Sequence, residues 1–194
     1  MTYWDPVPSA RLLVGRRHPL WPDGLVQHDW SKPAPDGWEN RDWRNVPGPF
    51  YTAGTDNCFT GRQCAPGHVA YEDEYCTEFV YRQPVDVAGV HEVTCAGECD
   101  PFGAYGGDGD RHWTLELVRD WWSERRRVRE WAAKVGWGEW AASEREQFRD
   151  AAAGARAYLA HLDHDLEKYL RDYMFWLSEG RPASPGERLP ALDA

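Results

Sequence analysis

Two short glycine-containing stretches carry cysteine and histidine at spacings that suit a metal site. Residues 64 to 68 read CAPGH, and residues 95 to 99 read CAGEC. Each stretch supplies a pair of thiolate or imidazole ligands, which is how two loops hold a tetrahedral structural zinc ion. Three residues separate the ligands of each pair, whereas two are usual in zinc knuckles. Structural zinc is therefore one interpretation, with Cys64, His68, Cys95 and Cys99 as its ligands.

The competing interpretation is that the five cysteines are reduced, buried and inert, and we favour it, so no cofactor is expected. An odd number of cysteines argues against a disulfide scaffold. A cysteine nucleophile needs a neighbouring cation or helix N-terminus to lower its pKa. Cys58, Cys64 and Cys76 lie among acidic residues instead, and we predict no catalytic residue.

Acidic side chains are concentrated in residues 71 to 110. This region carries ten Asp or Glu residues and only one basic residue, Arg82, which accounts for nearly all of the net charge of −10. A field of one sign repels nucleic acid and attracts basic proteins. We therefore expect a basic protein partner and no nucleic acid. The predicted binding residues are Glu72, Asp73, Glu74, Asp100, Tyr105, Asp108, Asp110 and His112. A merely solubilising surface is the alternative.

Two further polar stretches contain residues that could bind a metal ion. Asp100, Asp108 and Asp110 in DPFGAYGGDGDRHW could converge on a hard cation, but glycine and aspartate at these positions are also typical of turns, which we favour. His161 and Asp165 stand one helical turn apart in HLDHDLEKY. A His and an Asp at this spacing can chelate a transition metal or share protons. His161 lies outside the apolar seam of its helix, however, so we favour a polar stripe facing solvent.

The pattern of elements predicts an α+β fold. Residues 1 to 49 contain eight prolines and five tryptophans, which indicates an irregular arm pinned to an apolar surface. Short strands are expected at residues 50 to 54, 75 to 83 and 89 to 95, in a small antiparallel sheet. Acidic loops complete the region 50 to 112.

From residue 113 the apolar period becomes helical. Thr114 is a predicted N-cap for one helix that ends at Gly136, and a second helix is expected near Ser143 with Glu146 in a capping box. The seam of the second helix comprises Phe148, Ala152, Ala155, Leu159, Leu162, Leu166, Tyr169, Tyr173 and Trp176. Such a seam fits an antiparallel hairpin at residues 113 to 179, with a homodimer through the seam as the rival. Residues 1 to 180 would form one domain, followed by a flexible tail, 181 to 194.

The first 30 residues lack the features of a signal peptide, and no segment approaches 18 uninterrupted apolar residues. We therefore expect a cytoplasmic protein without membrane contact. Phosphate-binding glycine loops, GxSxG and HExxH are absent from the sequence, which leans against common nucleotide-dependent and hydrolytic enzymes.

The phrases NVPGPFYTAGTDNC, TEFVYRQP and DPFGAYGGDGDRHW, followed by LVRDWW, resemble an uncharacterised family of soluble proteins from high-GC bacteria, over residues 45 to 125. In its acidic, tryptophan-rich character the chain also resembles small immunity proteins that neutralise toxins. The first resemblance implies no activity, and the second implies a binding protein but transfers no site residue.

Three functions follow from these observations. The leading one is an acidic, aromatic-rich module that neutralises or regulates a basic partner. The alternative is a small-molecule or metal-dependent enzyme with a pocket between the N-terminal arm and the sheet, which would use His68, His91 or His112 as acid or base. The third is a homodimeric structural or regulatory protein assembled through the seam.

Overall fold

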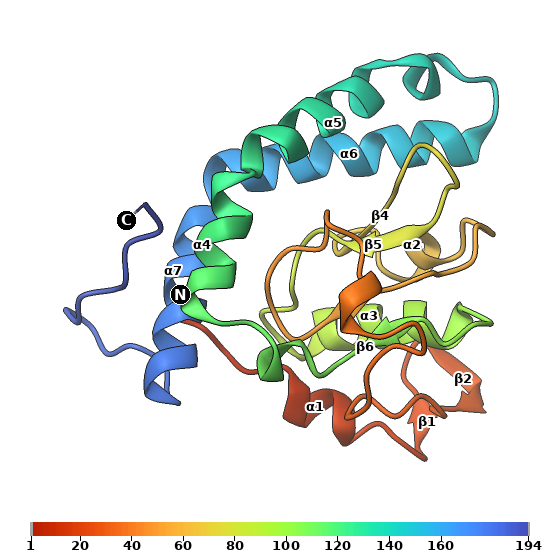
Figure 1. The fold of residues 1–194 in the computed structure, drawn as a ribbon. Coiled ribbons are helices and arrows are strands. Elements are labelled where there is room, and N and C mark those ends of the chain that lie inside the picture. Colours follow the sequence, from red (N-terminus) through yellow and green to blue (C-terminus); the bar gives the residue numbers. More distant parts are fainter. Residues whose placement is uncertain (1, 194) are drawn as a thin grey trace.

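A computed structural model describes residues 2 to 193, in which helices cover one side of several small antiparallel sheets (Figure 1). The fold is α+β, as the sequence predicts. The helices are α1 (Val7–Arg11), α2 (Gly61–Cys64), α3 (Val87–Cys99), α4 (Leu115–Ser123), α5 (Arg125–Trp137), α6 (Glu146–His164) and α7 (Leu166–Glu179). Three short 3-10 turns lie between these elements: η1 (Trp38–Asn40), η2 (Gly109–Arg111) and η3 (Glu139–Ala142).

The strands form three two-stranded antiparallel ladders. The pairs are β1 (Arg17–His18) with β2 (Trp21–Leu25), β3 (Tyr51–Thr52) with β6 (Tyr105–Gly106), and β4 (Val69–Tyr71) with β5 (Glu78–Val80). Ala70 lies opposite Phe79 in the last pair. The predicted strands at residues 50 to 54 and 75 to 83 are therefore present in shortened form. All residues of β4 and β5 are buried, so both faces of this ladder are covered.

The predicted strand at residues 89 to 95 is wrong, because this segment lies in the helix α3. The Asp86 side chain accepts a hydrogen bond from the backbone N–H of Gly89, at 2.8 Å, and thereby caps the helix. Val90, Val93 and Ala96 are fully buried at a helical spacing. The β-branched valines suggested a strand, but the cap and the buried face decide for a helix.

The long C-terminal helices lie side by side, with α5 along α6 and α4 along α7 (Figure 1). Thr114 caps α4 as predicted, since its hydroxyl accepts from the backbone N–H of Leu117. Each expected helix is instead two, with breaks at Glu124 and Asp165. The predicted capping box of Ser143 and Glu146 is wrong: α6 begins at Glu146 without a side-chain cap, and the Ser143 hydroxyl accepts from the backbone N–H of Arg145 instead.

Two apolar clusters fill the interior. The larger one lies between the long helices and the β4–β5 ladder, and it includes Phe79, Trp131 and Tyr158. Most residues of the predicted seam, such as Ala155, Leu162 and Tyr173, belong to this cluster or pack against it, so the seam makes contacts within one chain. The smaller cluster surrounds Trp30 and Val90 beside α3.

The N-terminal and C-terminal segments are both attached to this body. Residues 2 to 49 contain α1, the β1–β2 ladder and η1, with Trp30 fully buried. The tail was expected to be flexible. In the structure Leu192 is buried in the larger cluster, and the Arg119 side chain donates to the carbonyl of Ala191, at 3.1 Å.

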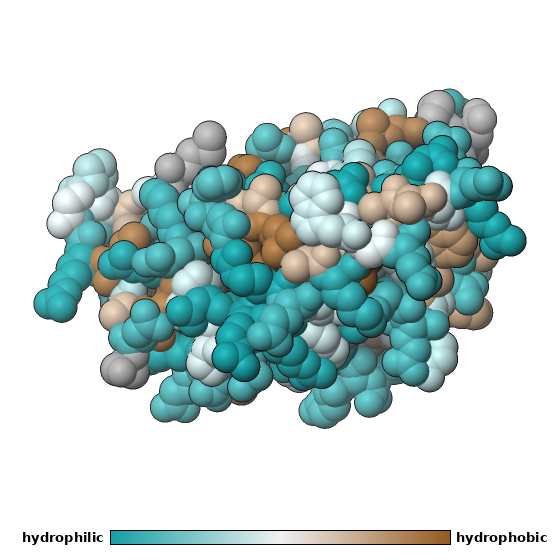
Figure 2. Space-filling model, turned by 90° about the horizontal axis from the view of Figure 1, so that it is seen from above, coloured by the Kyte–Doolittle hydropathy of each residue, from teal (hydrophilic) through white to brown (hydrophobic). Residues whose placement is uncertain are grey.

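The surface over the long helices is mostly hydrophilic, with small apolar patches between charged side chains (Figure 2). Within residues 2 to 193, no helix combines the length and the apolar character that crossing a membrane requires.

Candidate metal centre

Three cysteines from two helices converge on one point. Cys64 ends α2, and Cys95 and Cys99 lie one turn apart on α3. The Sγ atom of Cys64 lies 2.6 Å from that of Cys95 and 3.5 Å from that of Cys99. All three Sγ atoms lie within 4.8 Å of one another, and this is the only such group of potential metal ligands in the described part of the chain.

Local structure explains why these thiols meet. A spacing of four residues places Cys95 and Cys99 on the same face of α3. The short helix α2 packs against that face and begins at Gly61, whose backbone N–H donates to the buried carboxyl of Glu78 at 2.7 Å. A Cβ at Gly61 would lie 2.3 Å from a Glu78 oxygen, so any larger residue here would require the Glu78 carboxyl to move.

The thiols perturb one another. The pKa of Cys95 is lowered by its hydrogen bond with Cys64, whose own pKa the same contact raises. Burial raises the pKa of Cys99 to about 11. The three thiols thus act mainly on one another, and the carboxyl groups of Glu78 and Glu98 are the other charges that act on them. Cys58 and Cys76, which lie outside the cluster, have raised pKa values through the Asp56 side chain and burial, respectively.

A single zinc ion would set the spacing of these three sulfurs. Zinc binds thiolate sulfur at about 2.3 Å, so two sulfurs on the same ion lie about 3.8 Å apart in a tetrahedron and at most about 4.6 Å apart. The Cys64–Cys95 distance of 2.6 Å and the Cys64–Cys99 distance of 3.5 Å are shorter than the tetrahedral spacing, so the first pair of sulfurs would separate by about 1 Å on binding an ion. Cys64 and Cys99 are half-buried and Cys95 is buried, so solvent reaches one side of the cluster. A fourth ligand from outside the chain can approach there.

His68, the fourth predicted ligand, does not join the cluster. Its Nδ1 atom lies 2.9 Å from the carbonyl oxygen of Arg82, and its Nε2 atom lies 3.9 Å from a Glu92 oxygen. Burial lowers the pKa of His68, which favours the neutral ring. After α2 ends, the chain carries His68 toward the end of β5. The structure therefore brings together three of the four residues.

Four of the predicted binding residues are buried and hydrogen-bonded within the chain. Glu72 accepts from three backbone N–H groups of its own turn. Asp100 accepts from the backbone N–H groups of residues 56 and 104. Asp108 accepts from the hydroxyl of Tyr51 at 2.9 Å, and Tyr105 donates to Glu78 at 2.6 Å. These side chains stabilise turns and pair with the core, so they add little to the exposed acidic surface.

The other four predicted residues are more accessible. Asp73 pairs with Lys134 at 2.8 Å, and Asp110 accepts from the Tyr173 hydroxyl at 2.7 Å. His112 stacks on Trp38 and lies 3.1 Å from Asp108. Glu74 is exposed. A basic partner would therefore meet a smaller acidic area than the charge count indicates, and partner binding stays a prediction.

The loop aspartates do not form a cation site in the part of the chain described here, because the thiol cluster is the only group of potential ligands found there. The turn interpretation fits the glycines of this loop: a Cβ at Gly109 would lie 2.3 Å from the carbonyl oxygen of Gly48. Glycine allows these two backbone segments to approach.

Comparison with family models, curated proteins and solved structures finds no match to this chain, so the interpretation of the thiol cluster depends on its own geometry and chemistry.

Proposed function

We propose that this protein binds one thiophilic metal ion, zinc, through Cys64, Cys95 and Cys99. The observation that carries the proposal is the convergence of three Sγ atoms within 4.8 Å. Thiolates are the ligands that soft and borderline ions prefer, and zinc imposes no geometric preference of its own. A bound cation also supplies the positive charge that stabilises three adjacent thiolates.

The metal would link α2 to α3. The helix α2 has only four residues, too few to be stable alone, and it carries Cys64 at its end. A bond from Cys64 through the ion to Cys95 and Cys99 therefore stabilises the contact between the two helices. Three protein ligands leave the fourth position to water or a small ligand, an arrangement that structural sites rarely have and catalytic sites require.

The test is metal analysis of the purified protein and of matched serine variants. Native mass spectrometry with added zinc should show one ion per chain. Replacement of Cys64, Cys95 or Cys99 by serine should weaken zinc binding on the order of 100-fold or more, since each substitution removes a thiolate ligand. Cys58→Ser and Cys76→Ser are the controls and should bind zinc as the wild type does.

Failure of fully reduced protein to bind zinc would contradict the proposal, as would equal losses in the control variants. Loss of two hydrogens from the chain mass, abolished by Cys64→Ser or Cys95→Ser, would show that the cluster forms a disulfide instead. The same spectra would show whether a basic protein is bound, which tests the expected partner.

A further inference from the structure

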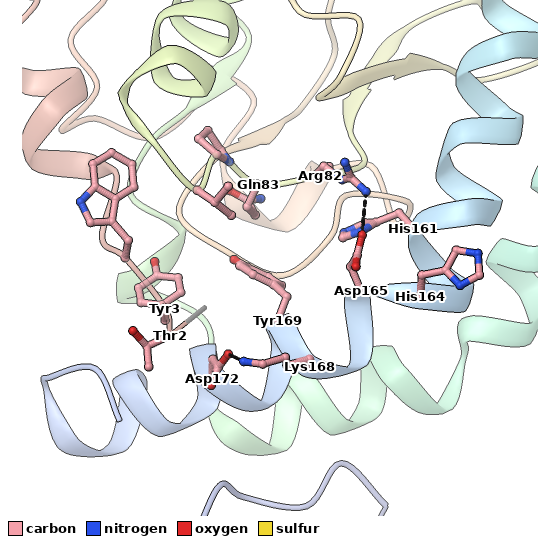
Figure 3. A pocket seen from close by; sticks show the side chains of 13 residues that line it. Thr2, Tyr3, Arg82, Gln83, His161, His164, Asp165, Lys168, Tyr169 and Asp172 are labelled. Carbon is pink, nitrogen blue, oxygen red and sulfur yellow. Dashed lines mark hydrogen bonds and ion pairs between the residues drawn. The ribbon is translucent and has the colours of Figure 1, made fainter. Parts of the chain in front are cut away.

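A cavity of about 370 Å³ lies away from the thiol cluster, between the N-terminal residues, the segment after β5 and the helices α6 and α7 (Figure 3). Its walls are largely apolar and aromatic, with Tyr3, Trp4, Pro84, Val85 and Tyr169. At one end Arg82, His161 and Asp165 come together (Figure 3). A cavity that combines apolar walls with a few polar groups at one end is typical of small-molecule sites.

Four lining residues have buried polar atoms without a hydrogen-bond partner in the described structure. These atoms are the hydroxyls of Tyr3 and Tyr169, Nε of Arg82 and Nε2 of His161. Tyr3 and His161 are only 6% and 4% exposed. Burial of a polar group without a partner is costly, so such groups are rare in proteins unless a ligand or water satisfies them. Their concentration around one cavity points to a ligand.

His161 is expected to act as a donor here. Its Nδ1 atom lies 3.3 Å from Nη2 of Arg82, and a guanidinium can only donate, so Nδ1 accepts. Burial lowers the pKa of His161 to about 3, which keeps the ring neutral. In a neutral ring whose Nδ1 accepts, the proton is on Nε2. Nε2 is therefore a donor without an acceptor.

All four unpartnered groups can thus donate a hydrogen bond. Arg82 adds a positive charge at the same end, where it lies 3.2 Å from Asp165, whose side chain is 68% exposed. In the other nearby ion pair, Nζ of Lys168 lies 2.5 Å from a carboxylate oxygen of Asp172. A ligand with acceptor oxygens and a negative charge would complement Arg82 and His161, and an apolar body would fill the space beside Trp4 and Tyr169.

We propose that this cavity binds a small organic carboxylate with an aromatic or aliphatic body. The carboxylate oxygens accept from Arg82 and His161 and displace the exposed Asp165 from Arg82. The body of the ligand packs on the aromatic walls, with Tyr169 donating to a further oxygen. Phosphate alone would not use the apolar walls.

The first test compares probes of one shape and different charge. Isothermal titration calorimetry on the full chain would use 3-phenylpropanoate, its amide 3-phenylpropanamide and the amine 3-phenylpropylamine. The carboxylate should bind with a Kd of about 10 µM to 1 mM, in keeping with its small size. The amide should bind at least about 10-fold more weakly, because it lacks the charge that strengthens hydrogen bonds to Arg82. The amine should bind most weakly.

The variants separate the role of each group. Arg82→Gln should weaken carboxylate binding at least about 10-fold, and Tyr169→Phe about 3- to 10-fold. Asp165→Asn removes the competing acceptor and should strengthen binding about 2- to 10-fold. Arg129→Gln is the matched control, since Arg129 pairs with Asp163 of α6 outside the cavity and its loss should leave the Kd unchanged.

Circular dichroism would establish that each variant is folded. If Arg82→Gln is not, Asp165→Asn decides, because its side chain is exposed and its expected effect is a gain. The proposal would be overturned by equal affinity for the carboxylate and the amide, by no binding of 3-phenylpropanoate at 1 mM, or by an unchanged Kd in folded Asp165→Asn and Tyr169→Phe.

Discussion

Arg62 of α2 and Asp150 of α6 form a two-bond ion pair across 88 residues of sequence. Nε and Nη2 of Arg62 lie 2.9 and 3.0 Å from the two carboxylate oxygens. The remaining nitrogen, Nη1, donates to the backbone carbonyls of Pro66 and Val69 at 2.9 and 2.8 Å. Arg62 is buried, at 6% exposure. The side chain thus holds the cysteine-bearing helix α2 and its following loop against the helical layer.

Replacement of Arg62 by alanine should destabilise the protein by about 3–5 kcal/mol, because it removes four hydrogen bonds of a buried guanidinium, among them the one to the carbonyl of the buried Val69. Urea unfolding would measure the change. The control is Arg129→Ala, which removes an exposed ion pair with Asp163 and should change the free energy of unfolding by at most about 1 kcal/mol. Similar losses in both variants would contradict the role assigned to Arg62.

Replacement of Gly154 by alanine should destabilise the protein, although helix propensity alone predicts that it would stabilise it. Alanine in place of glycine within a helix usually stabilises by about 0.5–1 kcal/mol. At Gly154 a Cβ would lie 2.7 Å from Nη1 of Arg62. Because that nitrogen is held by two carbonyls, it cannot move freely, and Gly154→Ala should destabilise by about 1–3 kcal/mol. Thermal unfolding measures the sign, and a more stable variant would show that Arg62 can shift.

Zinc should raise the thermal stability of the wild type. Ligand that binds only the folded state stabilises it by about 2.7 kcal/mol at a free concentration about 100 times Kd. For a chain of this size that corresponds to a rise in Tm of ~5–10 °C. Differential scanning calorimetry with zinc and with a chelator would measure it. Cys58→Ser should show the same rise, whereas a rise retained in Cys95→Ser would place the metal elsewhere.

Glu78 should make stability depend on pH. Burial raises the pKa of Glu78 to about 7, above its usual 4.5, although Tyr105 and the Gly61 backbone donate to the carboxyl. The folded state therefore holds this proton more tightly than the unfolded state. The contribution of Glu78 to stability is fully present below about pH 4.5 and is lost as the pH rises through about 7.

Glutamine resembles the protonated carboxyl and does not ionise. Glu78→Gln should therefore be more stable than the wild type at pH 8, on the order of 1–3 kcal/mol, and the difference should shrink toward pH 5. Chemical unfolding of both proteins at pH 5, 6, 7 and 8 measures the difference directly, so other titrating groups cancel. A difference that does not change with pH would contradict the raised pKa.

Several features were predictable because they depend on neighbouring residues. The α+β class follows from the change from short alternating stretches to a helical period near residue 113, and the Thr114 cap follows from its own side chain. The pairing of Cys95 with Cys99 in one candidate site was also readable from the spacing. In each case the interaction spans about one turn, so the local sequence determines it.

The error at residues 89 to 95 has a local cause. Valine taken by itself favours strands. The helix α3 forms instead because its valines are buried on one face and Asp86 caps its N-terminus.

The position of His161 was also not predictable from the sequence. Sequence reasoning placed it on a solvent-facing stripe, whereas the structure buries it beside Arg82. The only feature of the sequence that pointed to this contact is that Arg82 is the one basic residue in region 71 to 110, which has ten acidic residues.

The sequence by itself determined the class of the fold, the helix period and which residues could bind a metal. Only the tertiary structure decided that Cys64 joins Cys95 and Cys99 while His68 does not, and that buried carboxylates such as Asp108 serve the interior instead of the surface. The physical reason is that these outcomes depend on how α2 packs on α3 and how the loops pack on the core. Such contacts join residues dozens of positions apart, and their geometry is set by the packing of the whole chain.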